Sequence, residues 1–221
     1  SALLPGSMGK ASTKVKVKQI FSKSRPINLL SMARFFLFGA RDVWFVVALP
    51  IFLLSELAWS FQGVGGFLAL WIIGYGVVQS FAPNLIKSSQ DGHSVELKYA
   101  FLWMLILCFV TLSIALLIEV QFFVTVSLFT GLAIFGFCFA INSALHSYLI
   151  LNFSNVEDVT FSVGFYYSAN AAGRLLGTLL SGIVYQISGL TGVLVVTLIM
   201  LVIATFFTAR LGPTFNHEKT H

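Results

Sequence analysis

Residues 99–118 read YAFLWMLILCFVTLSIALLI, and residues 190–209 read LTGVLVVTLIMLVIATFFTA. Neither stretch contains a charged side chain, and each has about the 20 residues that an α-helix needs to cross the hydrocarbon core of a bilayer. The strands of a membrane β-barrel instead alternate apolar and polar residues over about ten positions. Because both runs are apolar without alternation, the sequence predicts an all-α membrane protein.

The composition of the whole chain agrees with this fold class. Of 221 residues, 57% are hydrophobic and 10% carry a formal charge, against about 45–50% and about 25% in an ordinary soluble domain. A net charge of +5 would suit nucleic-acid binding in a soluble protein. Here the basic residues gather between the apolar runs, so orientation in a lipid bilayer explains them, and no nucleic-acid partner is expected.

Six apolar runs follow one another along the chain, and we expect each of them to be a transmembrane helix. They cover residues 28–54, 61–86, 99–118, 122–153, 161–187 and 190–209. Polar and small residues separate the runs. Small residues also recur at four-residue spacing within them, and such rows let helices approach closely in lipid. The rows are Gly173, Gly177 and Ser181, and Gly136, Ala140 and Ala144.

The basic residues predict the orientation of these helices. Ten of the 13 Lys and Arg residues lie in residues 1–26, residues 87–98 and the end after residue 209, which share one side of a six-helix topology. The turns on the other side contain none, and cytoplasmic loops are the ones enriched in Lys and Arg. We therefore expect a basic cytoplasmic loop over residues 1–26, a six-helix bundle over residues 27–210 and a cytoplasmic tail over residues 211–221. The chain begins with Ser rather than Met, which suggests a piece of a longer protein.

Charged residues lie deep inside two of the apolar runs. Arg41 and Asp42 in the first run and Arg174 in the fifth each lie about thirteen residues from the start of the run, or ~20 Å at the rise of an α-helix. An arginine at this depth costs about 2.5–3.5 kcal/mol, whereas a leucine contributes only about 0.3–0.6 kcal/mol. These cations should therefore face protein or water and meet anionic groups.

Helical spacing extends the charges into polar stripes on three of the predicted helices. The stripes are Tyr167, Asn170, Arg174, Thr178 and Ser181; Arg34, Phe38, Arg41 and Phe45; and Asn142 with His146. Polar groups from three helices at membrane depth are typical of a solvated translocation cavity. Since one intramembrane acid faces two central arginines, at least one cation lacks a permanent partner, and an anionic substrate is the natural candidate.

The candidate site residues follow from these stripes. Substrate binding is expected at Arg41, Arg174, Asn170, Tyr167 and Asn142, and gating or proton coupling at Asp42, His146 and Arg34. Structural roles stay open for three of them. Arg174 could be locked to Asp42 in an ion pair, Arg34 could snorkel to the headgroups, and His146 could be a polar packing contact. No catalytic residue, metal site or cofactor is predicted, since Cys108 and Cys138 lie singly in apolar runs as small buried hydrophobic residues.

Six helices behind a long basic segment resemble the second half of a major facilitator superfamily transporter. Residues 82–87, APNLIK, resemble a degenerate form of a loop motif of that family. The resemblance implies that the chain forms helices seven to twelve of a twelve-helix fold, with the substrate held between the two halves. The partner would then be an N-terminal six-helix half of the same transporter.

Two longer stretches are similar to the ArsJ-type organoarsenical efflux permeases. They are residues 31–45, SMARFFLFGARDVWF, and residues 164–175, GFYYSANAAGRL; Ser168 and Ala172 stand where Met and Gly are expected. This resemblance implies export of 1-arseno-3-phosphoglycerate across a bacterial inner membrane, arsenate resistance, and a functional link to the glyceraldehyde-3-phosphate dehydrogenase that makes this ester. Arg41 and Arg174 would clamp the anion during alternating access.

Other functions are weighed against this one. A superfamily exporter of another phosphorylated or carboxylated metabolite, or of a drug, would share every feature except the two long stretches. An intramembrane enzyme needs paired catalytic groups, and a channel subunit needs a pore motif; the sequence contains neither pattern. We therefore expect a transporter and not an enzyme.

Overall fold

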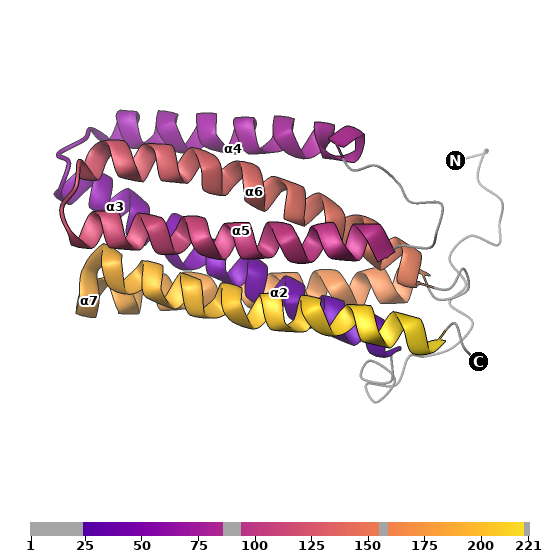
Figure 1. The fold of residues 1–221 in the computed structure, drawn as a ribbon. Helices are drawn as coiled ribbons and strands as arrows, with labels where there is room; N and C mark the ends of the chain where they lie inside the picture. Colours follow the sequence, from indigo (N-terminus) through magenta and orange to yellow (C-terminus); the bar gives the residue numbers. More distant parts are fainter. Residues whose placement is uncertain (1–23, 86–93, 155–158, 219–221) are drawn as a thin grey trace, which may run out of the picture.

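The computed structural model describes residues 24–85, 94–154 and 159–218. Every regular element in these ranges is an α-helix, which confirms the expected all-α fold class, and Figure 1 shows the helices gathered into one elongated bundle. The elements are α2 (Arg25–Phe45), α3 (Ala48–Ser55), α4 (Phe61–Leu85), α5 (Ser94–Glu119), α6 (Val124–Phe153) and α7 (Val159–Glu218). Within the described ranges, five helical stretches are long and apolar enough to cross a membrane: Arg25–Ser55, Phe61–Ala82, Val95–Glu119, Val124–Phe153 and Val159–Gly212.

The last of these stretches reverses direction in its middle. A straight helix of 60 residues would extend about 90 Å, three times the ~30 Å of the hydrocarbon core. Gly189 interrupts the helical backbone of α7 with φ 60° and ψ −160°, a conformation that glycine adopts without steric cost. Figure 1 shows the segments before and after it running in opposite directions. The chain therefore reverses at Gly189, where the sequence predicts a turn between the fifth and sixth apolar runs. The count of six membrane crossings stays a prediction.

The first predicted span, residues 28–54, coincides with the apolar stretch Arg25–Ser55, and its helix is broken within that stretch. α2 ends at Phe45 and α3 begins at Ala48. Pro50 explains the break, because it has no N–H to donate to the Val46 carbonyl and its ring clashes with that carbonyl. The backbone N–H of Ala48 donates to the Ser181 hydroxyl of α7 at 3.0 Å instead. A side chain of α7 thus satisfies a backbone group that the break in the first span sets free.

Glycines bring α7 and α2 into backbone contact. A Cβ added at Gly173 would collide with the Phe35 carbonyl, and one added at Gly177 would collide with the Gly39 carbonyl. The row of small residues on α7 is therefore a packing surface for α2. The row on α6 also packs against a neighbour, since a Cβ at Gly136 would meet the indole of Trp71 on α4.

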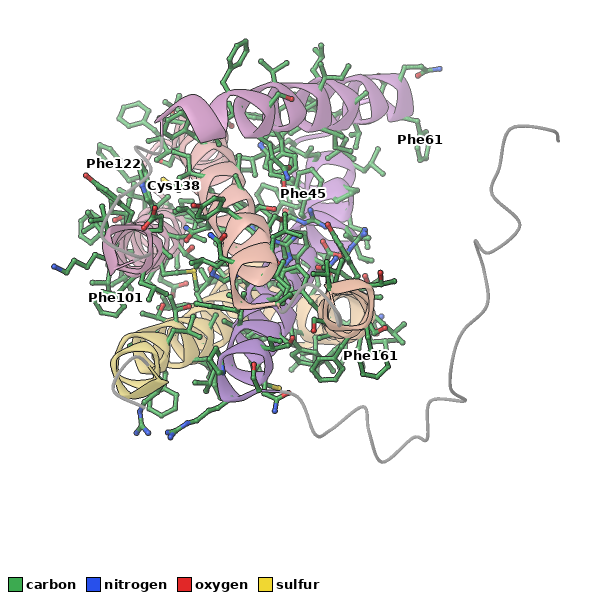
Figure 2. The ribbon with its side chains drawn as sticks, turned by 90° about the vertical axis from the view of Figure 1, so that its right-hand side faces the viewer. Phe45, Phe61, Phe101, Phe122, Cys138 and Phe161 are labelled. Carbon is green, nitrogen blue, oxygen red and sulfur yellow. The ribbon has the colours of Figure 1, made fainter. Side chains whose placement is uncertain are left out.

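α4 differs from the other long helices in its exposure. It packs on α6 and α3 and leaves large apolar side chains uncovered along its length. In Figure 2, which looks along the bundle, α4 crosses one side at an angle to the other helices, with Phe61 at its outer end. α4 is thus the least enclosed helix of the bundle.

Parts of the predicted loops lie outside the described residues. These parts are residues 1–23 of the basic segment, residues 86–93, residues 155–158 and residues 219–221. The predicted tail, residues 211–221, is helical as far as Glu218, where α7 ends. The tail is therefore mostly a continuation of the last helix.

Candidate anion-binding site

A carboxylate in the middle of the bundle is held by arginines from two helices. Asp42 of α2 is only 1% exposed. Arg41 approaches its Oδ1 with Nη2 at 2.6 Å and Nε at 2.7 Å. Arg174 of α7 donates its Nε–H to the other oxygen, Oδ2, at 2.9 Å. The ion pair between Arg174 and Asp42, which was one of the two expectations for Arg174, is thus present, and Asp42 shares its charge with Arg41.

We call Arg41, Asp42 and Arg174 the Asp42 triad. Two guanidinium groups and one carboxylate leave one uncompensated positive charge. The Arg41 side chain is 13% exposed and lies over the rings of Phe38 and Phe139, at 5.1 and 5.3 Å from their centroids. The Arg174 side chain is 52% exposed. The donors that Arg174 does not use on Asp42 are therefore available at the surface of the bundle.

A third arginine, Arg34, lies deeper inside the bundle than expected. It is 4% exposed, and its Nη1 donates to the Ser143 carbonyl at 3.1 Å and to the Ser143 hydroxyl at 3.2 Å. Its guanidinium carbon lies 3.8 Å from the centroid of Phe38 and 5.0 Å from that of Tyr166. The snorkelling role was wrong, because this face of α2 is turned toward α6 and α7 rather than toward the headgroups.

Ser143 is the centre of a small polar cluster around Arg34. Gln79 of α4 donates to its hydroxyl at 3.5 Å, and Ser147 donates to its carbonyl at 2.9 Å. Sequence reasoning missed Ser143, Gln79 and Tyr166. The available signals were a glutamine deep in the apolar run of α4 and the position of Ser143 directly after Asn142.

Asn142 and His146 are both fully buried on α6. The Asn142 amide donates to the Cys138 carbonyl of its own helix at 3.2 Å. The Asn142 Oδ1 and both ring nitrogens of His146 have no hydrogen-bond partner among the described residues. The two side chains thus contribute unsatisfied polar atoms to the interior of the bundle.

Tyr167 and Asn170 lie on the same helix as Arg174. Tyr167 is half exposed and packs edge-on against the Tyr166 ring, with centroids 5.4 Å apart. The Asn170 Oδ1 is buried without a hydrogen-bond partner in the described part of the chain. The structure therefore brings Arg41, Asp42 and Arg174 together by direct contact, whereas no hydrogen bond within the described ranges joins Asn142, Tyr167 or Asn170 to them.

Helices of this length and apolarity are typical of a multi-pass membrane protein. A family model described as Major Facilitator Superfamily matches residues 29–220. The match covers most of the chain, so the chain belongs to this superfamily of membrane transporters. No curated protein sequence matches the chain. Membership confirms the expected superfamily and the expected class of function, which is transport.

Proposed function

We propose that this chain is the second six-helix half of an exporter that moves an organic oxyanion by alternating access. The solute that the sequence resemblance favours is 1-arseno-3-phosphoglycerate, whose export would confer arsenate resistance. Residues 27–210 would then form helices seven to twelve of the transporter, in a bacterial inner membrane with both ends of the piece in the cytoplasm. The observation that carries the proposal is the exposure of Arg174 at membrane depth.

A half-exposed guanidinium in the membrane interior is unfavourable if it contacts lipid. An arginine facing lipid at mid-depth costs about 2.5–3.5 kcal/mol on insertion scales. The exposed side of Arg174 therefore favours contact with a water-filled cavity or with further protein. A second six-helix half would provide both, because substrate cavities in this superfamily form between the halves.

The chemistry of the Asp42 triad suits an oxyanion. Guanidinium groups bind carboxylate, phosphate and arsenate oxygens in pairs of parallel hydrogen bonds. Asp42 holds both arginines in the structure. A bound oxyanion would compete with Asp42 for Arg174, and the uncompensated charge of the triad would favour the anion. Tyr167 and Asn170, on the same helix, and Asn142 on α6 would supply neutral hydrogen bonds.

The exchange of Arg174 between Asp42 and the solute also gives the transporter a gate. While the solute holds Arg174, the link between α2 and α7 through Asp42 is open; after release, the link closes again. Asp42 and His146 would be the groups that couple proton movement to this exchange, and Arg34 would gate the inner end of the site.

A second candidate function is export of another phosphorylated or carboxylated metabolite. It is favoured by the same triad, because a guanidinium does not distinguish arsenate esters from phosphate esters. Transport assays with both kinds of ester separate the two candidates, and an adjacent glyceraldehyde-3-phosphate dehydrogenase gene in an arsenic operon would favour the arsenical.

The test uses everted membrane vesicles that carry the complete gene product. The vesicles receive arsenate, glyceraldehyde-3-phosphate and its dehydrogenase, and accumulated arsenic is measured. We expect uptake with the unmodified protein, its loss in Arg174→Ala, and normal uptake in Arg210→Ala, a matched control whose guanidinium stacks on Phe206 at 4.7 Å elsewhere on α7. Equal uptake in vesicles with and without the gene product would exclude the arsenical as substrate, and normal uptake in Arg174→Ala would exclude the clamp.

A further inference from the structure

Arg34 is a buried cation whose described contacts are all with neutral groups. They are the carbonyl and hydroxyl of Ser143 and the rings of Phe38 and Tyr166. The guanidinium stays protonated in proteins, and buried charges are normally paired with an opposite charge. Its Nε–H has no hydrogen-bond partner among the described residues. Arg34 thus retains both an uncompensated charge and a free donor.

Two further polar side chains with unused capacity lie beside Arg34. The Tyr166 ring is 5.0 Å from its guanidinium carbon, and the Tyr166 hydroxyl has no partner at full hydrogen-bond geometry within the described ranges, its interaction with Ser147 falling outside that geometry. His146 lies three residues after Ser143, and therefore on the same face of α6. Both His146 ring nitrogens are also without a described partner. Since more than about 90% of buried polar groups in proteins are hydrogen-bonded, unused donors clustered around a cation indicate a missing acceptor, such as an oxyanion.

Arg34 is also aligned with the Asp42 triad. Arg34 and Arg41 lie seven residues apart on α2, which is two turns or about 10 Å along the helix. Both guanidinium groups lie against the same ring, Phe38, at 3.8 and 5.1 Å from its centroid. The Phe38 ring is thus a shared apolar wall between two positively charged positions.

We propose that Arg34, Tyr166 and His146 form a second anion subsite, and that the solute is a short organic anion with an oxyanion at each end. One end would bind at the Asp42 triad, the other would bind at Arg34, and the carbon chain would pass Phe38. The proposal rests on the proposed function and narrows it, since an anion with a single charged group would fill only half of the site. Arg34, Tyr166 and His146 are buried, and the Gln79 side chain of α4, the least enclosed helix, bonds to Ser143 beside them.

The test compares the binding of two probes to the complete transporter in detergent. Inorganic phosphate has one oxyanion, whereas 3-phosphoglycerate has a phosphate and a carboxylate at opposite ends. A second charge-assisted contact is worth about tenfold to a hundredfold in affinity, so we expect 3-phosphoglycerate to bind tighter by this factor. Arg34→Gln should remove this difference, because it should weaken 3-phosphoglycerate binding far more than phosphate binding, and Arg210→Gln should leave both affinities unchanged.

A milder variant guards against misfolding. Tyr166→Phe removes only a hydroxyl whose interaction with Ser147 falls outside hydrogen-bond geometry, so a purely structural Tyr166 would tolerate it. We expect it to weaken 3-phosphoglycerate binding severalfold and to leave phosphate binding and thermal unfolding unchanged.

The outcomes separate the two proposals. If the unmodified protein binds neither probe, the oxyanion function is wrong. If it binds phosphate but shows no preference for 3-phosphoglycerate, only the second subsite is wrong. A preference that survives in both Arg34→Gln and Tyr166→Phe also overturns the subsite, as does an equal loss of both affinities in Arg34→Gln with no change in Tyr166→Phe.

Discussion

α2 has one glycine and α4 has five, yet α2 is the helix whose backbone touches a neighbouring helix. α2 touches the backbone of α7 through Gly39, Gly173 and Gly177, and it carries the buried Asp42. On α4, Cβ atoms added at Gly65, Gly66, Gly74 and Gly76 would meet nothing within 4 Å. A glycine-rich helix therefore does not by itself form a contact surface within the bundle. In this chain the buried charges lie where glycines hold two backbones together.

The largest effect on the α2–α7 side should come from Asp42→Asn. The substitution leaves Arg41 and Arg174 without their shared carboxylate, and breaking a buried ion pair costs about 3–5 kcal/mol. We expect a loss in free energy of unfolding of about 3 kcal/mol, the lower end of that range, because the Arg174 side chain is half exposed. Unfolding in mixed micelles titrated with SDS measures the change. Glu119→Gln, at the exposed end of α5, is the matched control, and equal stabilities would show that the triad does not hold the helices together.

The next largest loss of stability should come from a substitution at the backbone contact between α2 and α7. Gly177→Ala puts a methyl group against the Gly39 carbonyl, whereas Gly182→Ala, five residues later on the same helix, meets nothing within 4 Å. Overpacking typically costs about 1–3 kcal/mol, so Gly177→Ala should lose that much stability. Gly182→Ala should be neutral or slightly stabilising, since alanine favours helices over glycine. The same unfolding titration checks the pair, and indistinguishable values would mean that α2 and α7 separate easily.

The charges and the helices were predictable from the sequence for a simple physical reason. Lipid does not solvate charge, so Arg41, Asp42 and Arg174, at matching depth in two apolar runs, had to meet one another or a solute. The uninterrupted apolar runs of α5 and α6 likewise predict helices close to those observed.

The rest depends on features that hydropathy does not register. The break before α3 depends on one missing N–H, at Pro50, within an apolar run. The burial of Arg34 depends on how α2 is rotated against α6, because its partner Ser143 is only one of several hydroxyl side chains along that helix. Helix rotation in a bundle follows from packing with several neighbours together, and the sequence pattern of one helix does not determine it.

A smaller effect is expected where α7 supports the break in the first span. Ser181→Ala removes the hydroxyl that accepts the Ala48 N–H at 3.0 Å. Leaving a buried donor unsatisfied costs about 1–3 kcal/mol, and we expect a loss near 1 kcal/mol at the lower end of that range, because the N–H can shift toward its own helix. Ser113→Ala is the control, since the Ser113 hydroxyl bonds only to the Phe109 carbonyl of its own helix in the described structure. Equal losses in the two variants would show that the capping contact contributes nothing.

The smallest change in the free energy of unfolding is expected for a substitution on α4. It tests whether the open face of α4, unlike the packed face of α2, is free of contacts. Gly76→Leu adds a side chain to an open face, so the free energy of unfolding should change by less than about 0.5 kcal/mol, as for substitutions away from contacts. If the other half of the transporter covers this face, the same leucine should strongly reduce vesicle uptake by the complete protein. Gly182→Leu is the control for an open position on α7. Normal uptake in Gly76→Leu would mean that the open face of α4 meets lipid. The other half of the transporter would then contact Arg174 over α7 without also covering α4.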